Sequence, residues 1–448
     1  MLPDYKNKPS LHIGILSQKK ILFELSGEYC VHGLSKTLNG LFTASIKENK
    51  INLENGSDIL SAESEIIFEP KNFDFDSFLV QDVIIGIKFH WQRKEEERFK
   101  GTLKLIKDGD DLTLINILPI EDYLVSVNSS EMSATSSIEL LKAHAIVTRS
   151  WLLAQKEKSK EIKNYNTNSS LTDDEIIKWY DREEHKLYDV CADDHCQRYQ
   201  GISKISTEAV KQAVSQTSGV VLVSEDKICD ARFSKSCGGI SESFENVWEP
   251  VKHAYLSPVI DSKYKDTMFD INFSEEDNAV KWIKGNPAAF CNSSDRKILS
   301  QILLDYDQET ADYFRWVVSY SQKELSQLIM DKSGIDFGNI LDLIPVERGA
   351  SARLIKLKIV GSKKVLTVGK ELEIRRMLSP THLYSAAIVI EKFDVVDNIP
   401  LRFKIFGAGW GHGVGLCQIG AAVMAEKGYK YDEILSHYFK NTKLIKLY

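Results

Sequence analysis

The sequence lacks several features that would each indicate a class of protein. It has no apolar run of about 18 residues, so no transmembrane helix is expected. Its 7 cysteines are too few for a disulfide scaffold in a chain of 448 residues, and the odd number leaves at least one without an intrachain partner. A net charge of −7 gives no general basic surface, which argues against nucleic acid as a partner.

The N-terminal segment MLPDYKNKPSLHIGIL also lacks the basic stretch and apolar core of a signal peptide. We therefore expect that the protein is cytoplasmic or that its leader lies outside this sequence. Short-period repeats and low-complexity segments are missing as well. Hydrophobic residues make up 43% of the chain and charged residues 27%, as in ordinary globular proteins, and the length suits two or three domains.

The predicted fold class is α+β with mainly antiparallel strands and a helical core, because short strand-like runs at hairpin spacings dominate the chain. Runs such as KILFEL and LFTASI are rich in β-branched or aromatic residues. We expect four parts in chain order: a β-rich part at 11–118, a core with the candidate sites at 119–261, a mixed helix and strand elaboration at 262–400, and a closing segment at 401–448.

Two helices are expected at the start of the core, separated by the polar segment NSSEMSATS. The first begins with Pro119 as its first helical residue. Ser136 and Glu139 match the S-x-x-E capping box, which predicts that the second helix runs over about 137–156. Residues 157–184 are expected to form a charged, partly flexible insertion.

Glu131 is the first candidate for chemistry, since it lies in the polar segment between the two predicted helices. A loop held by two helices is a good platform for a reactive side chain. The neighbouring Val127 and Met132 would supply an apolar surround, which raises the pKa of a carboxylic acid toward that of a general acid. The alternative is an ordinary surface glutamate.

His185, Cys191, His195 and Cys196 form a compact set of soft ligands of the kind that zinc prefers. The adjacent His195 and Cys196 need a turn to point both side chains inward, and the aspartates just before them favour one. Two alternatives stay open: a Cys191–Cys196 disulfide in an oxidising compartment, and unlinked surface residues.

The stretch GWGHGVGLCQIGA at 409–421 has glycine at every second position around His412. It lies between a predicted strand and a predicted helix that ends before Gly428, yet no register fits a dinucleotide or phosphate-binding loop. Alternate glycines let another group approach the backbone closely. The alternative is a tight turn that carries a solvated histidine.

The segment SKSCGGISESFENVW places Cys237 directly before two glycines. Such a cysteine could be a nucleophile beside exposed amides, with His144, His253 or His412 as its base. The other interpretation is a Gly-Gly turn that lines a site and carries a small buried cysteine.

Three motifs occur together and in the order of a known family. The sequence LPIEDYLVSVNSSEM…SIELLKAHAIVTRSW resembles the core signature of the SpoIID/LytB family, which comprises stage II sporulation protein D and amidase-enhancer proteins. FSKSCGGISESFENVW…AYLSPVID and GWGHGVGLCQIGAAVMAEKGYKYDEILSHYF are similar to its second and third signatures, and ARLIKLKIVGSKKVLTVGKELEIRRML to its connecting segment. The resemblance covers about 11–448.

The resemblance implies a lytic transglycosylase that acts on peptidoglycan glycan strands stripped of their peptides. It implies that Glu131 is the single acid and base, and that the histidine and cysteine cluster holds a structural zinc ion. It also implies an extracytoplasmic, cell-envelope location. Another implied function is a non-catalytic, glycan-binding activator of a cell-wall amidase. The implied glycan contacts are Arg149, Ser236, Cys237, Gly238, Gly239, Tyr255, His412 and Gln418.

Two positions depart from the family pattern. Cys417 stands where many relatives carry serine, and His144 stands where glutamine is usual.

On this resemblance we interpret the alternate glycines as the thin wall of a sugar groove, with His412 and Gln418 folded close to Glu131.

Overall fold

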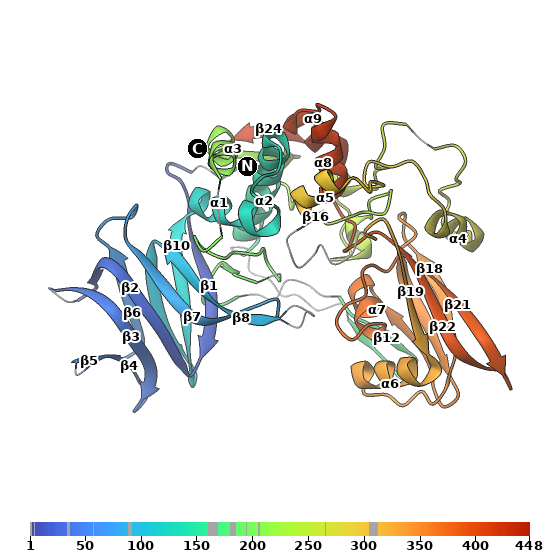
Figure 1. Cartoon of the computed structure of the whole chain (residues 1–448), viewed down its shortest axis with the longest axis horizontal. Coiled ribbons are helices and arrows are strands. Elements are labelled where there is room, and N and C mark those ends of the chain that lie inside the picture. Colours follow the sequence, from blue (N-terminus) through green and yellow to red (C-terminus); the bar gives the residue numbers. More distant parts are fainter. Residues whose placement is uncertain are drawn as a thin grey trace. The chain divides into compact units, whose positions relative to one another are not determined.

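The structure is a computed structural model of the whole chain, drawn in Figure 1. It describes residues 2–3, 5–33, 36–56, 58–87, 92–159, 169–179, 185–193, 195–204, 207–264, 266–303 and 312–448.

The chain divides into two compact units. The N-terminal unit comprises Pro3–Ala145, Arg182–Val220 and Lys446–Tyr448, and the C-terminal unit comprises Met1–Leu2, Ile146–Asp181 and Val221–Ile445. Each unit therefore collects segments that are far apart in the sequence. The four-part division made from the sequence stays a prediction.

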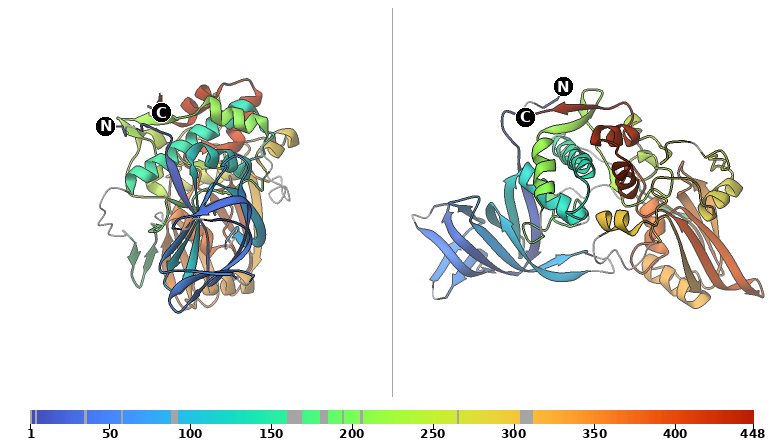
Figure 2. Two further views of the ribbon diagram at one scale, coloured as in Figure 1. Left: turned by 90° about the vertical axis from the view of Figure 1, so that its left-hand side faces the viewer. Right: turned by 45° about the horizontal axis from the view of Figure 1, so that its top comes forward.

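The N-terminal unit is built on one large sheet, to which eleven strands of the described residues belong. Its main path is β13-β1-β10-β9-β6-β2-β3-β4-β5, with β7 paired to β2 and β8 paired to β7, and Figures 1 and 2 show these strands mainly in blue. Pairing is antiparallel apart from the short β1–β13 ladder. The strands are β1 (Ser10–Gln18), β2 (Lys20–Val31), β3 (Thr37–Lys47), β4 (Lys50–Asn55), β5 (Asp58–Ala62), β6 (Glu65–Pro70), β7 (Ser77–Ile85), β8 (Arg93–Lys100), β9 (Thr102–Asp108), β10 (Asp111–Pro119) and β13 (Val190–Cys191).

Alternation of buried and exposed residues explains why these segments are strands. In β2 the apolar residues Ile21, Phe23 and Leu25 are buried and the residues between them are partly exposed. The ring of Phe23 packs against those of Phe42 at 5.5 Å and Phe68 at 5.6 Å between centroids. These aromatic contacts across the sheet form the core of the unit.

Three helices follow the sheet in sequence: α1 (Ile120–Glu131), α2 (Ile138–Lys158) and α3 (Glu208–Gln216). The predicted start of α1 is wrong by one residue, because Pro119 ends β10 and the helix begins at Ile120. The predicted cap of α2 is also wrong by one residue. Ser137 is the residue before the helix, and its hydroxyl accepts the Leu140 N–H at 3.4 Å.

The C-terminal unit contains two further antiparallel-rich sheets with helices packed on them, labelled in Figure 1. One sheet has the order β11-β12-β20-β19-β18 and the other β17-β22-β21, while β16 pairs with β23 and β14 lies between β15 and β24. The strands are β11 (Ser170–Leu171), β12 (Glu175–Ile177), β14 (Val220–Ser224), β15 (Lys227–Ile228), β16 (Phe233–Ser234), β17 (Arg315–Ser321), β18 (Ile340–Arg348), β19 (Leu354–Gly361), β20 (Val365–Gly369), β21 (Ile388–Val396), β22 (Ile399–Ala408), β23 (Leu416–Cys417) and β24 (Lys443–Lys446). The helices are η1 (Phe244–Asn246), η2 (Ala254–Leu256), α4 (Glu276–Lys284), α5 (Arg296–Ile302), α6 (Gln322–Ser333), α7 (Glu371–Met377), α8 (Gln418–Glu426) and α9 (Tyr431–Tyr438).

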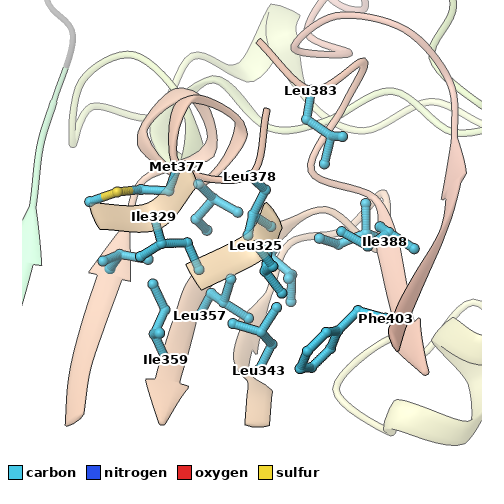
Figure 3. Close-up of a cluster of buried hydrophobic side chains, with 14 of the residues drawn as sticks. Leu325, Ile329, Leu343, Leu357, Ile359, Met377, Leu378, Leu383, Ile388 and Phe403 are labelled. Carbon is cyan, nitrogen blue, oxygen red and sulfur yellow. The ribbon is translucent and has the colours of Figure 1, made fainter. Parts of the chain in front are cut away.

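A core of buried aliphatic side chains joins α6 and α7 to these sheets, as Figure 3 shows. Leu325 and Ile329 from α6 meet Leu357 of β19, and Phe403 of β22 belongs to the same cluster. Burial of such side chains is the main stabilising contribution to the unit.

These elements confirm the α+β class and the predominance of antiparallel pairing. The helices and strands expected in the 262–400 segment are present, among them α6, α7, β19, β20 and β21. In the 157–184 segment α2 continues to Lys158 and β12 pairs in parallel with β20, while the expected charged, partly flexible insertion stays a prediction. Residues 160–168 and 180–184 of that segment lie outside the described residues. In the part of the chain that the structure describes, no helix has both the length and the apolar content needed to cross a bilayer.

Candidate active site

Glu131 is the last residue of α1, so the prediction of a loop position was wrong. Its side chain is half-buried between the fully buried Ser130 and Met132. Its Oε1 atom accepts a hydrogen bond from the backbone N–H of Arg198 at 2.7 Å. A carboxyl group at a helix end, held from outside the helix by a backbone donor, has a restricted orientation.

The helix that carries Glu131 is fastened to α2 by a buried histidine. His144 Nδ1 lies 2.6 Å from Asn128 Oδ1, and both side chains are fully buried. His144 is the residue noted as a departure from the family pattern, and Asn128 precedes Glu131 by three residues, about one helical turn. The pair therefore acts as a fixed link beneath the end of α1.

The segment after the metal-ligand candidates lies along the same helix. Tyr123 of α1 stacks on Tyr199 with 5.0 Å between ring centroids, and its hydroxyl donates to Gln197 at 3.3 Å. Together with Arg198, these contacts attach the segment on both sides of the Glu131 contact. The position of Glu131 thus depends on the loop that begins with the cysteine and histidine cluster.

The predicted ligands His185, Cys191, His195 and Cys196 come together, with their donor atoms all within 4.8 Å of one another. His185 Nε2 lies 3.3 Å from Cys196 Sγ, and His195 Nδ1 lies 3.5 Å from the same sulfur and 3.8 Å from Cys191 Sγ. Tetrahedral zinc with bonds of about 2.0–2.3 Å requires donor separations of about 3.3–3.8 Å. The four residues fit a zinc ion by number, donor type and spacing.

The alternatives to a metal cluster do not match the geometry. Every cysteine is a free thiol in the structure, so a Cys191–Cys196 disulfide is not formed. Hydrogen bonds from Cys196 and from the two imidazoles lower the pKa of the Cys191 thiol well below its usual range. Because a thiolate is the form that binds metal, this environment favours coordination over the unlinked arrangement.

The cluster is tied to the large sheet. Cys191 belongs to β13, which pairs with Ile13 and Gly14 of β1. The carboxylate of Asp193 accepts the backbone N–H groups of Gly86 at 3.0 Å and Ile87 at 3.2 Å. The loop therefore has the fixed backbone that a structural metal site needs.

In the C-terminal unit, the second and third motifs pair with each other. Ser236 and Trp410 exchange backbone hydrogen bonds at 3.0 and 2.8 Å, and β16 pairs in parallel with β23. The N–H of Glu242 donates to Gly413 O at 2.8 Å. Two segments separated by about 170 residues thus form one structural element.

The alternate glycines are explained by this pairing, which corrects the sugar-groove interpretation. Gly409, Gly411, Gly413 and Gly415 all have positive φ, between 74° and 92°. A Cβ on Gly409 would lie 2.7 Å from Ser236 O, and one on Gly413 would lie 2.5 Å from the Arg353 guanidinium carbon. The space into which a side chain would point at Gly409, Gly413 and Gly415 is filled by the protein itself, and this packing explains glycine at these positions.

A buried charge network holds the two motifs together, and sequence reasoning missed it. Arg353 donates through Nη1 to Cys237 O at 3.0 Å and through Nη2 to Gly411 O at 3.1 Å. The Ser351 hydroxyl accepts Arg353 Nη1 at 3.0 Å and donates to Glu242 at 2.6 Å. Arg353 and Glu242 are each 1% exposed. No local motif marks Arg353, since its partners are carbonyl groups more than 50 residues away in the sequence.

His412 is half-buried and has a structural environment, so the solvated alternative was wrong. Its Nδ1 accepts the Val414 N–H at 3.0 Å, and its ring also hydrogen-bonds to the backbone of Phe233. Burial, and then the positive charges of Arg232 and Arg353, hold the pKa of His412 well below its usual range. A neutral imidazole here links the two motifs. Its predicted closeness to Glu131 stays a prediction.

The other predicted glycan contacts lie in the same unit with different exposures. Cys237 is 2% exposed, so its thiol is neither an accessible nucleophile nor a glycan contact, and the buried-turn interpretation holds. Gly238 and Gly239 make that turn with φ of 79° and 108°. Tyr255 is half-buried, and its hydroxyl accepts the Asp230 N–H at 3.0 Å. Arg149, Ser236 and Gln418 have buried side chains, and their contact with substrate stays a prediction.

An aromatic group accompanies the glycine motif. Trp410 stacks on Tyr384 with 4.0 Å between ring centroids and lies 4.5 Å from the ring of Tyr313. Trp410 and Tyr384 are both half-buried, which leaves part of their surfaces accessible. Aromatic faces of this kind line many ligand sites.

We expect Gly413→Ala to lower the free energy of unfolding by about 2–5 kcal/mol, because it combines strain at positive φ with a clash against Arg353. Gly428→Ala is the matched control. Gly428 also has positive φ, 89°, but a Cβ there meets nothing within 4 Å, so only the strain of about 1–2 kcal/mol is expected. Equal losses in denaturant titrations of the two variants would contradict the close packing at Gly413.

Comparison with known proteins adds the family. Residues 108–223, which contain Glu131 and the metal cluster, match the family model described as Stage II sporulation protein. This match and the relatives described below support the resemblance to the SpoIID/LytB family. A second model, described as Domain of unknown function (DUF8618), matches residues 242–415.

Three relatives indicate how far the similarity extends. The chain is 26% identical over 348 residues to an uncharacterized protein of Brachyspira hyodysenteriae, which covers 78% of the chain and 72% of that protein. It is 24% identical over 331 residues to stage II sporulation protein D of Bacillus amyloliquefaciens, covering 73% and 74%. It is 24% identical over 333 residues to the amidase enhancer of Bacillus subtilis, covering 72% of the chain but 40% of that longer protein. The SpoIID/LytB similarity therefore extends well beyond the matched domain.

Proposed function

We propose that this SpoIID/LytB protein is a lytic transglycosylase that cleaves peptidoglycan glycan strands, with Glu131 as its single acid and base. The observation that supports this most is the setting of the Glu131 carboxyl group. It stands at the end of a helix, half-buried, with Oε1 oriented by the Arg198 N–H at 2.7 Å. A general acid needs a fixed orientation of this kind and partial access for its substrate.

The proposed reaction consumes no water. Glu131 in its acid form donates a proton to the glycosidic oxygen as the bond from that oxygen to the anomeric carbon breaks. The resulting carboxylate takes the proton from the 6-hydroxyl of the same muramic acid residue, whose oxygen bonds to the anomeric carbon. The products are a 1,6-anhydro-muramoyl end and a free sugar hydroxyl, and Glu131 is again protonated. One carboxyl group is enough for this sequence, whereas a hydrolytic glycosidase uses two.

Glycan binding by the C-terminal unit is supported by the aromatic group at the glycine motif. Stacked Trp410 and Tyr384 keep accessible surface, and sugar rings have apolar faces that pack on such side chains. We therefore assign glycan contact to Trp410 and Tyr384, and assign His412 and the glycines to the fold of the loop that carries them.

The histidine and cysteine cluster would hold a structural zinc ion that keeps the 191–198 loop in place. Its four protein ligands leave no open coordination position. Because the proposed substrate lies outside the cytoplasmic membrane, the proposal also locates the working protein in the cell envelope.

The direct test is incubation of the protein with glycan strands from which the peptides have been removed, followed by mass spectrometry. We expect disaccharide units with anhydro-muramoyl ends, which are lighter by one water than the products of hydrolysis. Reducing muramic acid ends would indicate a hydrolase instead, and intact strands would overturn the enzymatic proposal.

The similarity to the amidase enhancer supports a second candidate, a glycan-binding activator of a cell-wall amidase. The two functions are distinguished by adding a purified cell-wall amidase and intact peptidoglycan. Release of peptides that increases with this protein, while the glycan strands stay intact, would favour the activator.

A further inference from the structure

A second cluster of potential metal ligands lies in the C-terminal unit. It shares no residue with the cluster at 185–196. Cys237, Asp261, Cys291 and Cys417 bring three sulfurs and a carboxylate oxygen within 4.8 Å of one another. All four residues are buried, with exposures between 0% and 2%. They come from four separate segments, and no sequence motif joins them.

The distances suit a metal ion better than a disulfide. Cys237 Sγ and Cys291 Sγ are 3.7 Å apart, whereas a disulfide bond is about 2.05 Å long. Around a tetrahedral zinc ion with Zn–S bonds of about 2.3 Å, two sulfurs are separated by about 3.8 Å. The remaining ligand atoms lie within the same small sphere, so one ion can reach all four.

Backbone N–H groups of the cluster residues and the Tyr438 hydroxyl orient the ligands. The Cys237 N–H donates to Cys417 Sγ at 3.3 Å, and the Cys291 N–H donates to Asp261 Oδ2 at 2.8 Å. The Tyr438 hydroxyl donates to Asp261 Oδ1 at 2.6 Å. Donors that point at sulfur and carboxylate stabilise the negative forms that bind metal, and they fix ligand directions as the outer partners of known metal sites do.

The surroundings are packed closely around the cluster. A Cβ on Gly420 of α8 would lie 2.3 Å from the Tyr438 hydroxyl and 2.5 Å from Asp261 Oδ1. The helix can approach the carboxylate only because residue 420 has no side chain. Asp261 is fully buried beside three thiols, and a buried carboxylate charge is costly unless a nearby cation balances it.

We propose that Cys237, Asp261, Cys291 and Cys417 bind a structural zinc ion. The ligand set is soft, as zinc prefers, and four protein ligands in a buried site leave no position for substrate or water. Three thiolates and one carboxylate around Zn²⁺ carry a net charge of about −2. The nearby Arg315, which donates to Gly238 O at 3.1 Å, supplies a positive charge on the Cys237 side.

The ion would hold together the parts of the C-terminal unit that meet at the motifs. Cys237 precedes the Gly-Gly turn, and Cys417 stands at the N-terminus of α8. Asp261 and Cys291 flank the segment that contains α4. The departure at Cys417 from the usual serine is thereby explained by a ligand role. This inference does not depend on the proposed enzymatic activity.

Elemental analysis of the purified full-length protein tests the proposal. We expect about two zinc ions per chain in the wild type, one for each cluster. Cys196→Ser removes the first site and should leave about one zinc per chain, and Cys291→Ser should leave about one by removing the second. Cys229→Ser is the control, because Cys229 is a buried free thiol of the same unit outside both clusters, and it should keep both ions.

Two further measurements test the second cluster without changing any of its ligands. Cobalt loaded into Cys196→Ser should give intense thiolate-to-cobalt absorption, since the second cluster has three thiolates. Thiol titration of the unreduced protein after denaturation with a chelator should find all 7 cysteines free. Five free thiols would reveal one disulfide. Peptide mapping that places this bond at Cys237, Cys291 or Cys417 would overturn the proposal, as would wild-type protein with one zinc that Cys291→Ser retains.

Discussion

Replacing Glu131 by glutamine is expected to lower the rate of anhydro-muramoyl product formation by about 10²–10⁴-fold, the range seen when general acid–base catalysis is removed. The amide has the shape of the carboxyl group, and its oxygen can still accept the Arg198 N–H that Glu131 accepts at 2.7 Å. The substitution therefore removes the transferable proton and leaves the loop contact in place. The measurement is the initial rate of product release from denuded glycan strands.

Glu208→Gln is the matched control for this experiment. Glu208 lies on α3 of the same unit, 76% exposed, and pairs only with the neighbouring Lys211 at 3.0 Å among the ion pairs of the described residues. It should keep wild-type activity, zinc content and thermal stability. Undiminished activity of Glu131→Gln would reject Glu131 as the acid and base. Loss of activity together with zinc would instead indicate that the loop had been disturbed.

Glu131→Gln also distinguishes the two candidate functions, the lytic transglycosylase and the amidase activator. An activator of an amidase does not use Glu131 as an acid, so Glu131→Gln should stimulate peptide release as well as the wild type does. A lytic transglycosylase whose cleavage products open the wall for an amidase should lose stimulation and cleavage together. The comparison therefore decides between a catalytic and a binding role.

Local patterns in the sequence were enough to predict most elements, and the errors have identifiable causes. The polar segment NSSEMS was expected to end the first helix early, yet α1 continues to Glu131. Ser129 donates back to Val125 O at 3.0 Å, and Asn128 is paired with His144 of α2. Ser129 and Asn128, whose side chains often interrupt a helix, are bonded here to the helix itself and to its neighbour. Tertiary contacts of this kind cannot be seen in a single sequence.

The two clusters of candidate metal ligands differ in how far apart their residues lie in the sequence. His185, Cys191, His195 and Cys196 were predictable because all four lie within a short loop, which limits how far apart they can be. Cys237, Asp261, Cys291 and Cys417 span most of the C-terminal unit, and only the fold brings them together. The glycine motif was recognised as a close approach, but the approaching groups are the protein's own backbone and Arg353.

Arg353→Met is expected to have the largest effect on stability, about 3–5 kcal/mol, since it removes one partner from a buried charge network. The change leaves Cys237 O and Gly411 O without their guanidinium donors and removes the positive charge that Arg353 places near the buried Glu242. Methionine fills part of the volume, so the loss reports the polar contacts more than a cavity. Denaturant titrations followed by tryptophan fluorescence suit the measurement, because Trp316 and Trp410 lie in this unit.

Arg402→Met is the matched control for Arg353→Met. Arg402 also pairs with a carboxylate, Asp394, but their side chains are 66% and 51% exposed. An exposed ion pair contributes about 0–1 kcal/mol, because water screens it and solvates both charges when it is broken. A large loss of unfolding free energy in Arg353→Met and a small loss in Arg402→Met would show that the buried contacts of Arg353 stabilise the paired glycine motifs. Similar small losses would mean that the paired glycine motifs hold each other through their backbone hydrogen bonds alone, and that the carbonyl groups around Arg353 find water when it is removed.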